Sequence, residues 1–163
     1  MIKLLFVCHG NICRSPMAEF VMKDLVDQAG LTDQFYIASA ATSTEEIGSP
    51  VHRGTRERLA REGISVSGKH AVRLRQADYG EYDLLLGMDS WNIRNMNAML
   101  GGDPERKIHL LLDYTGRPGE DIADPWYTGN FEDTYRDVLE GCQGLLEELR
   151  RTHKLDKPGK KKG

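Results

Sequence analysis

The chain has 163 residues, of which 22 are basic and 25 acidic, so its formal net charge at pH 7 is −3. This length is usual for one domain and allows a sizeable core without support from disulfides or metals. The near balance of charges argues against a nucleic-acid groove and against a membrane-binding face, so function must be sought in a local site.

The first expected strand covers residues 2–7, and its apolar run is short. Residues 4–7 are too few for the apolar segment of a signal peptide or for a membrane span. The chain has three cysteines, and an odd number fits a disulfide-bonded secreted protein poorly. We therefore expect a cytoplasmic protein with reduced thiols and no membrane partner.

The loop after this strand is typical of a pocket for a phosphate dianion. Cys8 and Arg14 stand at its two ends with five residues between them, and Gly10 and Asn11 lie in the turn. Glycine allows the backbone to approach a ligand closely, and asparagine tolerates a left-handed conformation. The fork of a guanidinium matches two phosphate oxygens. The loop therefore presents a thiol and a cation to one anion.

A helix over residues 16–29 is expected directly after the loop. Ser15 offers an N-cap hydroxyl, Pro16 stands at the first helical position, and Gly30 is placed to end the helix. The unpaired N–H groups and the dipole of this helix start would stabilise a bound oxyanion and the thiolate form of Cys8. The Ser15 hydroxyl would also lie close enough to donate to the Cys8 sulfur.

Three more β-type segments follow, at residues 35–38, 82–88 and 108–112. Helices are expected after Ser49 over residues 50–61, and after Asp89 over residues 90–99. The last helix has apolar residues at spacings of three and four, namely Phe131, Tyr135, Val138, Cys142, Leu145 and Leu149. Such a stripe is typical of a helix that packs one face on a core.

The alternation of strands and helices predicts a three-layer α/β fold, a doubly wound four-stranded parallel sheet flanked by helices. Ligands of such sheets bind beyond the carboxyl ends of the strands, where Cys8 must lie. We expect a single domain over residues 1–152 and a flexible basic tail over 153–163, because residues 157–163 are lysine-rich and lack apolar side chains.

Residues 121–127 form a second informative segment, since they follow the fourth strand and can reach the same edge of the sheet. Breaking a phosphate ester requires a proton for the leaving oxygen, and a positioned carboxylic acid contributes about 10²- to 10⁴-fold. Asp124 is the candidate acid, and Asp121 is the alternative. Trp126 and Tyr127 would either wall a pocket for an aryl phosphate or anchor the loop.

The segments VCHGNICRSP (7–16) and DPWY (124–127) resemble the low-molecular-weight protein tyrosine phosphatase family. The resemblance implies the phosphotyrosine phosphatase I-like fold and hydrolysis of phosphotyrosine or aryl phosphate monoesters. It also implies that Cys8 is the nucleophile, that Arg14 binds the phosphoryl group and that Asp124 is the proton donor.

The same resemblance implies supporting residues around the phosphate. The phosphate-binding residues would be His9, Gly10, Asn11, Ile12, Cys13, Arg14 and Ser15. The substrate pocket would be formed by His9, Trp126 and Tyr127. Loop support would come from Asn11, Ser39, His70 and Asp89. Segment 68–73 departs from the His-x-Ala-Arg run of the family, so a surface histidine is the alternative reading of His70.

The implied reaction is a two-step hydrolysis through a phosphocysteine intermediate, with inorganic phosphate as the product. Its substrate would be a phosphotyrosine protein or a small aryl phosphate. We expect neither a cofactor nor a metal, because the five histidines are scattered without ligand spacing. His9 and the acidic segment 44–46 depart from many relatives and bear on substrate choice.

Three alternative functions, and the role of Cys13, remain open from the sequence. Related phosphoarginine phosphatases carry threonine where this chain has Ile12. Related arsenate reductases use further cysteines as a relay, whereas Cys142 lies on the apolar stripe of the last helix. The third rival is a phosphotyrosine-binding module without catalysis. Cys13 either lines the loop floor or forms a reversible disulfide that protects Cys8 from over-oxidation.

Overall fold

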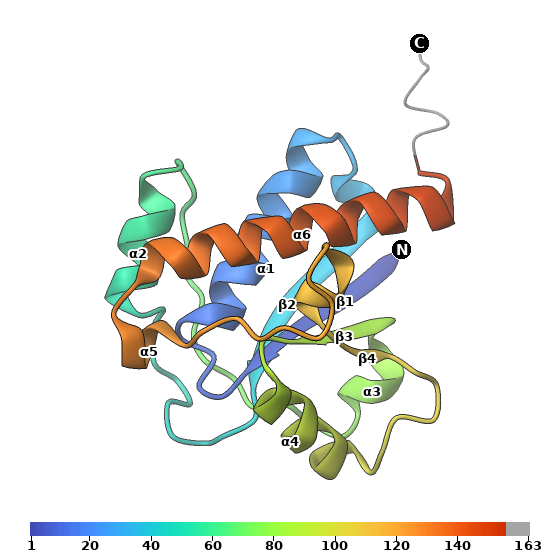
Figure 1. The fold of residues 1–163 in the computed structure, drawn as a ribbon, viewed down its shortest axis with the longest axis horizontal. Coiled ribbons are helices and arrows are strands. Elements are labelled where there is room, and N and C mark those ends of the chain that lie inside the picture. Colours follow the sequence, from blue (N-terminus) through green and yellow to red (C-terminus); the bar gives the residue numbers. More distant parts are fainter. Residues whose placement is uncertain (156–163) are drawn as a thin grey trace.

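The structure, a computed structural model, describes residues 1–155, and the rest of the expected tail, 156–163, lies outside the described residues. Within the described part, four parallel strands form one sheet in the order β2-β1-β3-β4. Their bounds are Ile2–Cys8 for β1, Phe35–Ala41 for β2, Leu84–Gly87 for β3 and Ile108–Leu110 for β4. The expected parallel sheet is confirmed, with β1 in its interior (Figure 1).

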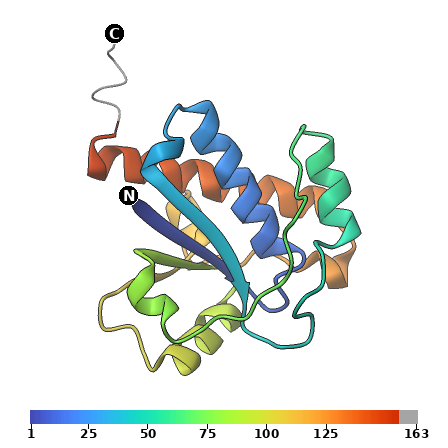
Figure 2. The ribbon, with the colours of Figure 1, turned by 180° about the vertical axis from the view of Figure 1, so that it is seen from behind.

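Helices cover both faces of this sheet. They are α1 (Arg14–Gln28), α2 (Arg53–Ala60), α3 (Asp78–Glu81), α4 (Ser90–Leu100), α5 (Pro125–Thr128) and α6 (Phe131–His153), with 3-10 turns at Thr32–Gln34 and Leu111–Tyr114. The helices α1, α2 and α6 lie on one face, and α3 and α4 lie on the other (Figures 1 and 2). The doubly wound, three-layer arrangement is therefore confirmed.

The side chains of β1 alternate between two hydrophobic cores, as the period of two in a strand requires. Leu4, Phe6 and Cys8 belong to the core shared with α1 and α6. Leu5 and Val7 belong to the core shared with α4. This alternation places the side chain of Cys8 on the α1 side of the sheet, at the point where the chain leaves the strand.

The helix α1 begins earlier than expected. Its first residue is Arg14 and its N-cap is Cys13, which makes no side-chain capping bond. Ser15 and Pro16 therefore lie inside the first turn, and the expected N-cap role of Ser15 is wrong. The cause lies in the loop, because the Ser15 N–H donates to the sulfur of Cys8 at 3.4 Å and the helix starts over that sulfur.

The helix α2 begins at Arg53, later than the expected start after Ser49. Nδ1 of His52 accepts the Gly54 N–H at 2.9 Å and so caps the helix in place of a hydroxyl. The Ser49 hydroxyl donates instead to Glu46 at 3.0 Å. The Ser49-Pro50 pair therefore does not start a helix, because the Ser49 hydroxyl is bonded to Glu46.

The helix α6 carries the expected apolar stripe. Its buried hydrophobic residues are Tyr135, Val138, Cys142, Leu145, Leu146 and Leu149. The helix continues through His153, and Leu155 packs against the core, so packing extends into the first residues of the expected tail. Every helix within residues 1–155 is too short or too polar to cross a lipid bilayer.

Gly144 in α6 is expected not to tolerate alanine. A Cβ at this position would lie 1.9 Å from the backbone oxygen of Tyr114, so the backbone would have to move. We expect Gly144→Ala to lower the free energy of unfolding by about 1–3 kcal/mol, the usual cost of overpacking, although alanine has the higher helix propensity. Urea unfolding measures the change. The control is Gly80→Ala, which has open space around it, and equal stability of the two variants would contradict this prediction.

Candidate active site

A pocket lies at the carboxyl end of β1, where the loop before α1 meets the loop after β2 and the chain around α5. Its lining residues are Cys8, His9, Gly10, Ile12, Cys13, Arg14, Glu45, Glu46, Asp124, Trp126 and Tyr127. The structure thus brings Cys8, Arg14 and Asp124 together from opposite ends of the sequence.

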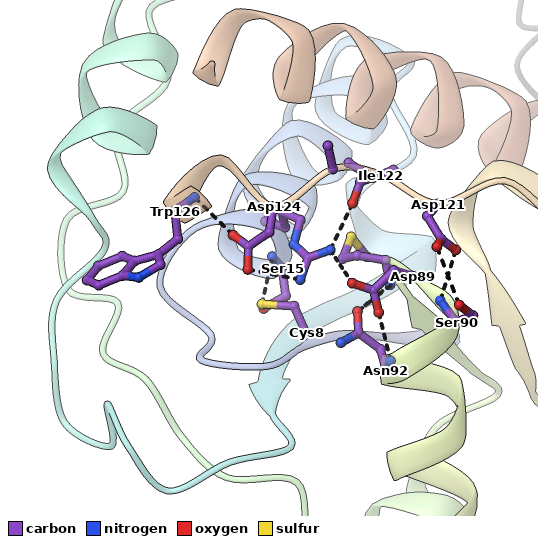
Figure 3. Close-up of polar contacts among 12 residues, drawn as sticks. Cys8, Ser15, Asp89, Ser90, Asn92, Asp121, Ile122, Asp124 and Trp126 are labelled. Atoms are coloured by element: carbon purple, nitrogen blue, oxygen red, sulfur yellow. Dashed lines mark hydrogen bonds and ion pairs between the residues drawn. The ribbon is translucent and has the colours of Figure 1, made fainter. Parts of the chain in front are cut away.

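The sulfur of Cys8 lies under the first turn of α1. Cys8 is 3% exposed, and its Sγ lies 3.0 Å from Oγ of Ser15 (Figure 3). The same sulfur accepts the Ser15 N–H at 3.4 Å. The expected contact between the Ser15 hydroxyl and the thiol is therefore present. Donors at a sulfur and the positive end of a helix dipole both stabilise its anionic form.

The guanidinium of Arg14 is buried and held by three acceptors. Nη1 donates to Oδ2 of Asp89 at 2.7 Å and to the carbonyl oxygen of Ile122 at 2.8 Å. Nη2 donates to Oδ2 of Asp124 at 3.4 Å. Burial lowers the pKa of Arg14, but the anions around it, Cys8 foremost, outweigh burial and raise the pKa overall. The pocket therefore keeps a permanent cation at its floor.

Asp89 connects the guanidinium of Arg14 to the start of α4. Its Oδ1 accepts the Asn92 N–H at 2.8 Å as the N-cap of that helix, while its Oδ2 faces Arg14. Asn92 returns the contact, since its side-chain oxygen accepts the Asp89 N–H at 3.1 Å (Figure 3). A carboxylate that caps a helix and pairs with an arginine fixes the arginine relative to the sheet.

The two candidate acids lie in different surroundings. Asp124 lines the pocket, and its Oδ1 accepts the Trp126 N–H at 3.0 Å as the N-cap of α5. Asp121 instead accepts the backbone N–H of Ser90 at 2.9 Å, away from the sulfur (Figure 3). The helix α5 is too short to show periodicity, so it was not predicted, although a capping aspartate before Pro125 is a helix-start signal.

Aromatic rings stand at the mouth of the pocket. Trp126 is 55% exposed and Tyr127 is 83% exposed, so neither forms the pocket floor. The Trp126 ring packs edge-on against His52 with centroids 5.7 Å apart, and His52 stacks on Phe131 at 5.2 Å. Exposed ring faces beside an anion site suit an aromatic group attached to a phosphate.

The loop after β2 adds negative charge to the rim. Glu45 and Glu46 line the pocket, and Nε2 of His9 lies 3.3 Å from Oε1 of Glu45. The backbone oxygen of His9 also accepts the Ser43 N–H at 3.0 Å. His9 therefore contacts the loop after β2 through both its ring and its backbone.

Asn11 adopts the left-handed conformation expected of it, with a φ of 59°. Its side-chain nitrogen donates to Oγ of Ser15 at 2.8 Å and to Oγ of Ser39 at 2.9 Å. Its side-chain oxygen accepts the Val72 N–H at 3.1 Å. The strained turn is therefore fixed by three polar contacts, two of them to residues outside the loop.

His70 does not lie where the resemblance implied. Its side chain is exposed and lines a separate surface hollow, and its backbone pairs with Pro50. Its neighbour Lys69 points inward instead, with Nζ 3.0 Å from the backbone oxygen of Ser39. The surface position left open as the alternative for His70 is therefore the one the structure shows.

Two residues near Ser39, Glu19 and Lys69, were not predicted from the sequence. Glu19 is 5% exposed and accepts the Ser39 hydroxyl at 2.5 Å, and Lys69 lies 3.7 Å from the same carboxylate. Glu19 stands four residues after Ser15 on α1, so a charged residue on the inner face of that helix was the available signal. No local signal marked Lys69.

The thiol of Cys13 lies buried in the same loop as Cys8. Burial raises the pKa of Cys13 to about 12, and the neighbouring Cys8 and Asp124 add to this shift. Cys13 therefore stays protonated at neutral pH. The three cysteines are free, and the disulfide between Cys8 and Cys13 stays a prediction. Within residues 1–155, no group of three or more His, Cys, Asp or Glu side chains is arranged to hold a metal ion.

A parallel α/β fold with a thiol, a buried guanidinium and a carboxyl group in one pocket is typical of a cysteine-dependent phosphatase. The chain belongs to the low molecular weight phosphotyrosine protein phosphatase family, whose model matches residues 3–155.

Relatives of this family are similar over nearly the whole chain. The low molecular weight protein-tyrosine-phosphatase YfkJ of Bacillus subtilis is 41% identical over 156 residues, 95% of this chain and 100% of that protein. Its crystal structure matches with a TM-score of 0.89 at 42% identity, over 93% of this chain and 96% of that one. A low molecular weight protein tyrosine phosphatase from Streptococcus pyogenes gives 0.83 at 40% identity, over 96% and 99%. A Drosophila arginine phosphatase gives 0.82 at 32% identity, over 91% and 98%.

Proposed function

We propose that this phosphatase hydrolyses phosphotyrosine in proteins and small aryl phosphates through a phosphocysteine intermediate on Cys8. The observation that carries the proposal is the convergence of Cys8, Arg14 and Asp124 on one pocket with exposed aromatic rings at its mouth. The thiol, cation and acid of this pocket match the three needs of phosphate ester cleavage, which are a nucleophile, charge stabilisation and a proton donor.

In the first step, the Cys8 thiolate attacks phosphorus and forms a sulfur–phosphorus bond. The bond from phosphorus to the phenolic oxygen breaks, and Asp124, as the carboxylic acid, gives its proton to that oxygen. Tyrosine leaves as a neutral phenol and Asp124 remains as a carboxylate. Arg14 and the N–H groups of residues 9–15 bind the non-bridging oxygens throughout.

In the second step, water attacks the phosphorus of the phosphocysteine. The Asp124 carboxylate takes a proton from that water, and the sulfur–phosphorus bond breaks. Inorganic phosphate leaves, the Cys8 thiolate returns, and Asp124 is again an acid. The two steps use the same three side chains and consume one water.

Two features favour this function over its rivals of the same fold. Ile12 presents an apolar side chain to the pocket and offers no hydrogen bond to the guanidino group of a phosphoarginine. Cys142 is fully buried in the core, with its sulfur 3.7 Å from the backbone oxygen of Ala18, so it is not placed as the relay thiol of an arsenate reductase.

The test is phosphate release by the purified protein from a phosphotyrosine peptide, from p-nitrophenyl phosphate and from phosphoarginine, with arsenate reduction by thiols measured in parallel. We expect turnover of the two aryl esters at least about 100-fold above that of phosphoarginine, the size of effect expected from a mismatched polar group. Preference for phosphoarginine or arsenate would identify a rival activity. Tight binding of phosphotyrosine without phosphate release would identify a binding module.

We further propose that the protein acts in the cytoplasm, where its partners would be phosphotyrosine proteins. Thiolate catalysis requires a reduced Cys8, and the chain carries three free cysteines. A reducing compartment keeps such thiols from oxidation. Fractionation of the source cells followed by immunodetection would test this placement, and recovery from an oxidising compartment would contradict it.

Asp124→Asn is expected to lower kcat/KM for phenyl phosphate by about 10²- to 10⁴-fold, because kcat/KM reports the first step and the amide cannot protonate the leaving oxygen. The loss should be smaller for p-nitrophenyl phosphate, whose phenolate leaves without a proton. The control is Asp121→Asn, which changes a carboxylate of the same segment outside the pocket. A similar loss of kcat/KM in both variants, or a loss of kcat/KM independent of the leaving group, would remove Asp124 as the proton donor.

A further inference from the structure

The ring of His52 contacts two other aromatic side chains beside the pocket. It stacks on Phe131, with the ring centroids 5.2 Å apart and an angle of 18° between the planes. It meets Trp126 edge-on, with centroids 5.7 Å apart and an angle of 78°. His52 is the N-cap of α2, Trp126 belongs to α5, and Phe131 is the first residue of α6. Three segments that are distant in the sequence therefore meet at one imidazole.

The position of this imidazole is fixed by contacts other than the one to Trp126. The backbone N–H of His52 donates to the carbonyl oxygen of Ile12 at 2.8 Å, which joins it to the loop before α1. Its Nδ1 accepts the Gly54 N–H at 2.9 Å, so the hydrogen of the neutral ring lies on Nε2. The Phe131 ring packs closely on Gly54, where a Cβ would lie 2.4 Å from two ring atoms. The imidazole is therefore a fixed surface for Trp126.

Trp126 needs such a surface because its own helix is short. The helix α5 has four residues, begins after the Asp124 cap and ends at Gly129, which has a φ of 71°. A single helical turn is not stable by itself, so the direction of the indole follows from what it packs against. Trp126 lines the pocket, and Figure 3 shows its indole extending from α5 toward the side of the site where α2 lies. That is the side of His52.

A fixed indole at the mouth of the pocket favours binding of an aryl group. An aryl group attached to a phosphate near Cys8 passes the mouth, where Trp126 is 55% exposed. Ordering a mobile side chain costs entropy when a ligand binds. If the indole is ordered before the ligand arrives, this cost is already met by the contact with His52. The phosphate itself lies against the loop before α1 and gains nothing from the indole.

We propose that His52 is a positioning residue that holds the Trp126 indole at the pocket mouth and thereby sets how tightly the pocket binds the aryl group of its substrate. His52 acts through Trp126 and does not touch the phosphate, so binding of inorganic phosphate is independent of the imidazole. The inference rests on the proposed function, the hydrolysis of aryl phosphates. Its test measures ligand binding and the motion of the indole, and neither measurement needs turnover.

The decisive variant is His52→Asn, which removes the ring and keeps the cap. The asparagine oxygen takes the place of Nδ1 as the acceptor of the Gly54 N–H, and asparagine is a preferred N-cap. We expect binding of phenylphosphonate to weaken about threefold to tenfold, the effect of losing one aromatic pair, and binding of inorganic phosphate to change by less than about twofold. Isothermal titration measures both dissociation constants. Equal weakening of both ligands, or of neither, overturns the proposal.

A second variant, His52→Phe, keeps a ring and removes the capping nitrogen. Loss of the cap should lower the urea concentration at the midpoint of unfolding, while the affinity for phenylphosphonate should stay closer to that of the wild type than in His52→Asn. A purely structural role of His52 gives the opposite order, because affinity then follows stability and His52→Phe loses more of both. That order would contradict the positioning role. If His52→Phe does not fold, the titrations of His52→Asn still decide.

Fluorescence reports on the indole directly. The chain has two tryptophans, so Trp91→Phe leaves Trp126 as the only one. In that background, His52→Asn should lower the fluorescence anisotropy of Trp126, because the indole gains motion, and an unchanged anisotropy would overturn the proposal. The control is His109→Asn, which removes an imidazole that lies edge-on to Tyr114, with centroids 6.2 Å apart, outside the pocket. It should change neither the anisotropy nor the two dissociation constants.

The outcomes for the proposed function and for His52 are distinguishable. If the wild-type protein fails to hydrolyse aryl phosphates, the proposed function is wrong. The titrations with phenylphosphonate and the anisotropy of Trp126 then still decide whether His52 positions the indole.

Discussion

Replacing Cys8 with serine is expected to reduce hydrolysis of p-nitrophenyl phosphate to the background rate. A serine hydroxyl is not ionised at neutral pH, and loss of a covalent nucleophile costs on the order of 10⁶-fold in kcat. The variant should still bind phosphate, because Arg14 and the N–H groups of residues 9–15 remain in place. Steady-state kinetics and isothermal titration with phosphate measure the two properties separately.

The matched control for this change is Cys142→Ser. Cys142 is a buried cysteine of α6 outside the pocket, so the same replacement there should affect stability and leave turnover close to that of the wild type. Full turnover by Cys8→Ser would exclude the phosphocysteine mechanism. Loss of phosphate binding together with turnover would show instead that the loop had collapsed.

Arg14→Lys is expected to lower kcat by about 10³-fold, a loss in the range measured when an arginine or an oxyanion donor is removed from a transition state. Lysine keeps the charge but presents one ammonium in place of a planar fork. It cannot hold Asp89 and the Ile122 carbonyl with one nitrogen while offering a second nitrogen toward the pocket. Steady-state kinetics with phosphotyrosine peptide would measure the loss.

The control for Arg14→Lys is Arg58→Lys. Arg58 is also a buried arginine paired with carboxylates, and it stacks on the ring of Tyr135 with its guanidinium carbon 3.9 Å from the centroid. Its replacement should lower thermal stability without a comparable loss of kcat. A fall of kcat by less than about fivefold in Arg14→Lys would show that the charge alone, and not the fork, serves the reaction.

The sheet could be predicted from the sequence because its strands are apolar runs with strong signals at their ends. The starts of α1 and α2 could not be predicted from the serine-proline pairs, because both serine hydroxyls have stronger partners in the fold. Ser15 is engaged by Cys8 and Asn11, and Ser49 by Glu46. A capping signal predicts a helix start only when nothing distant competes for the hydroxyl.

In the candidate site, residues that are neighbours in the sequence were predictable, whereas contacts between distant segments were not. The segment from Cys8 to Ser15 is contiguous, so spacing and residue type were enough to predict a single loop that ends in Cys8 and Arg14, and the binding of one phosphate by its members stays a prediction. The partners of Ser39 were not predictable, because α1, β2 and the segment around Lys69 meet only through tertiary packing. The resemblance implied His70, whereas the side chain that reaches Ser39 in the structure is that of Lys69.

The alternation of β1 between two cores constrains where the sulfur can be. If one residue were added or lost inside this strand, Leu4 and Phe6 would exchange sides with Leu5 and Val7, and every buried side chain of the strand would face the wrong helices. Cys8 would then emerge on the α4 side, with no helix start above it. The length of β1 therefore determines on which face of the sheet the Cys8 sulfur lies. A shift of one residue in the register of this strand would be as damaging as losing the thiol.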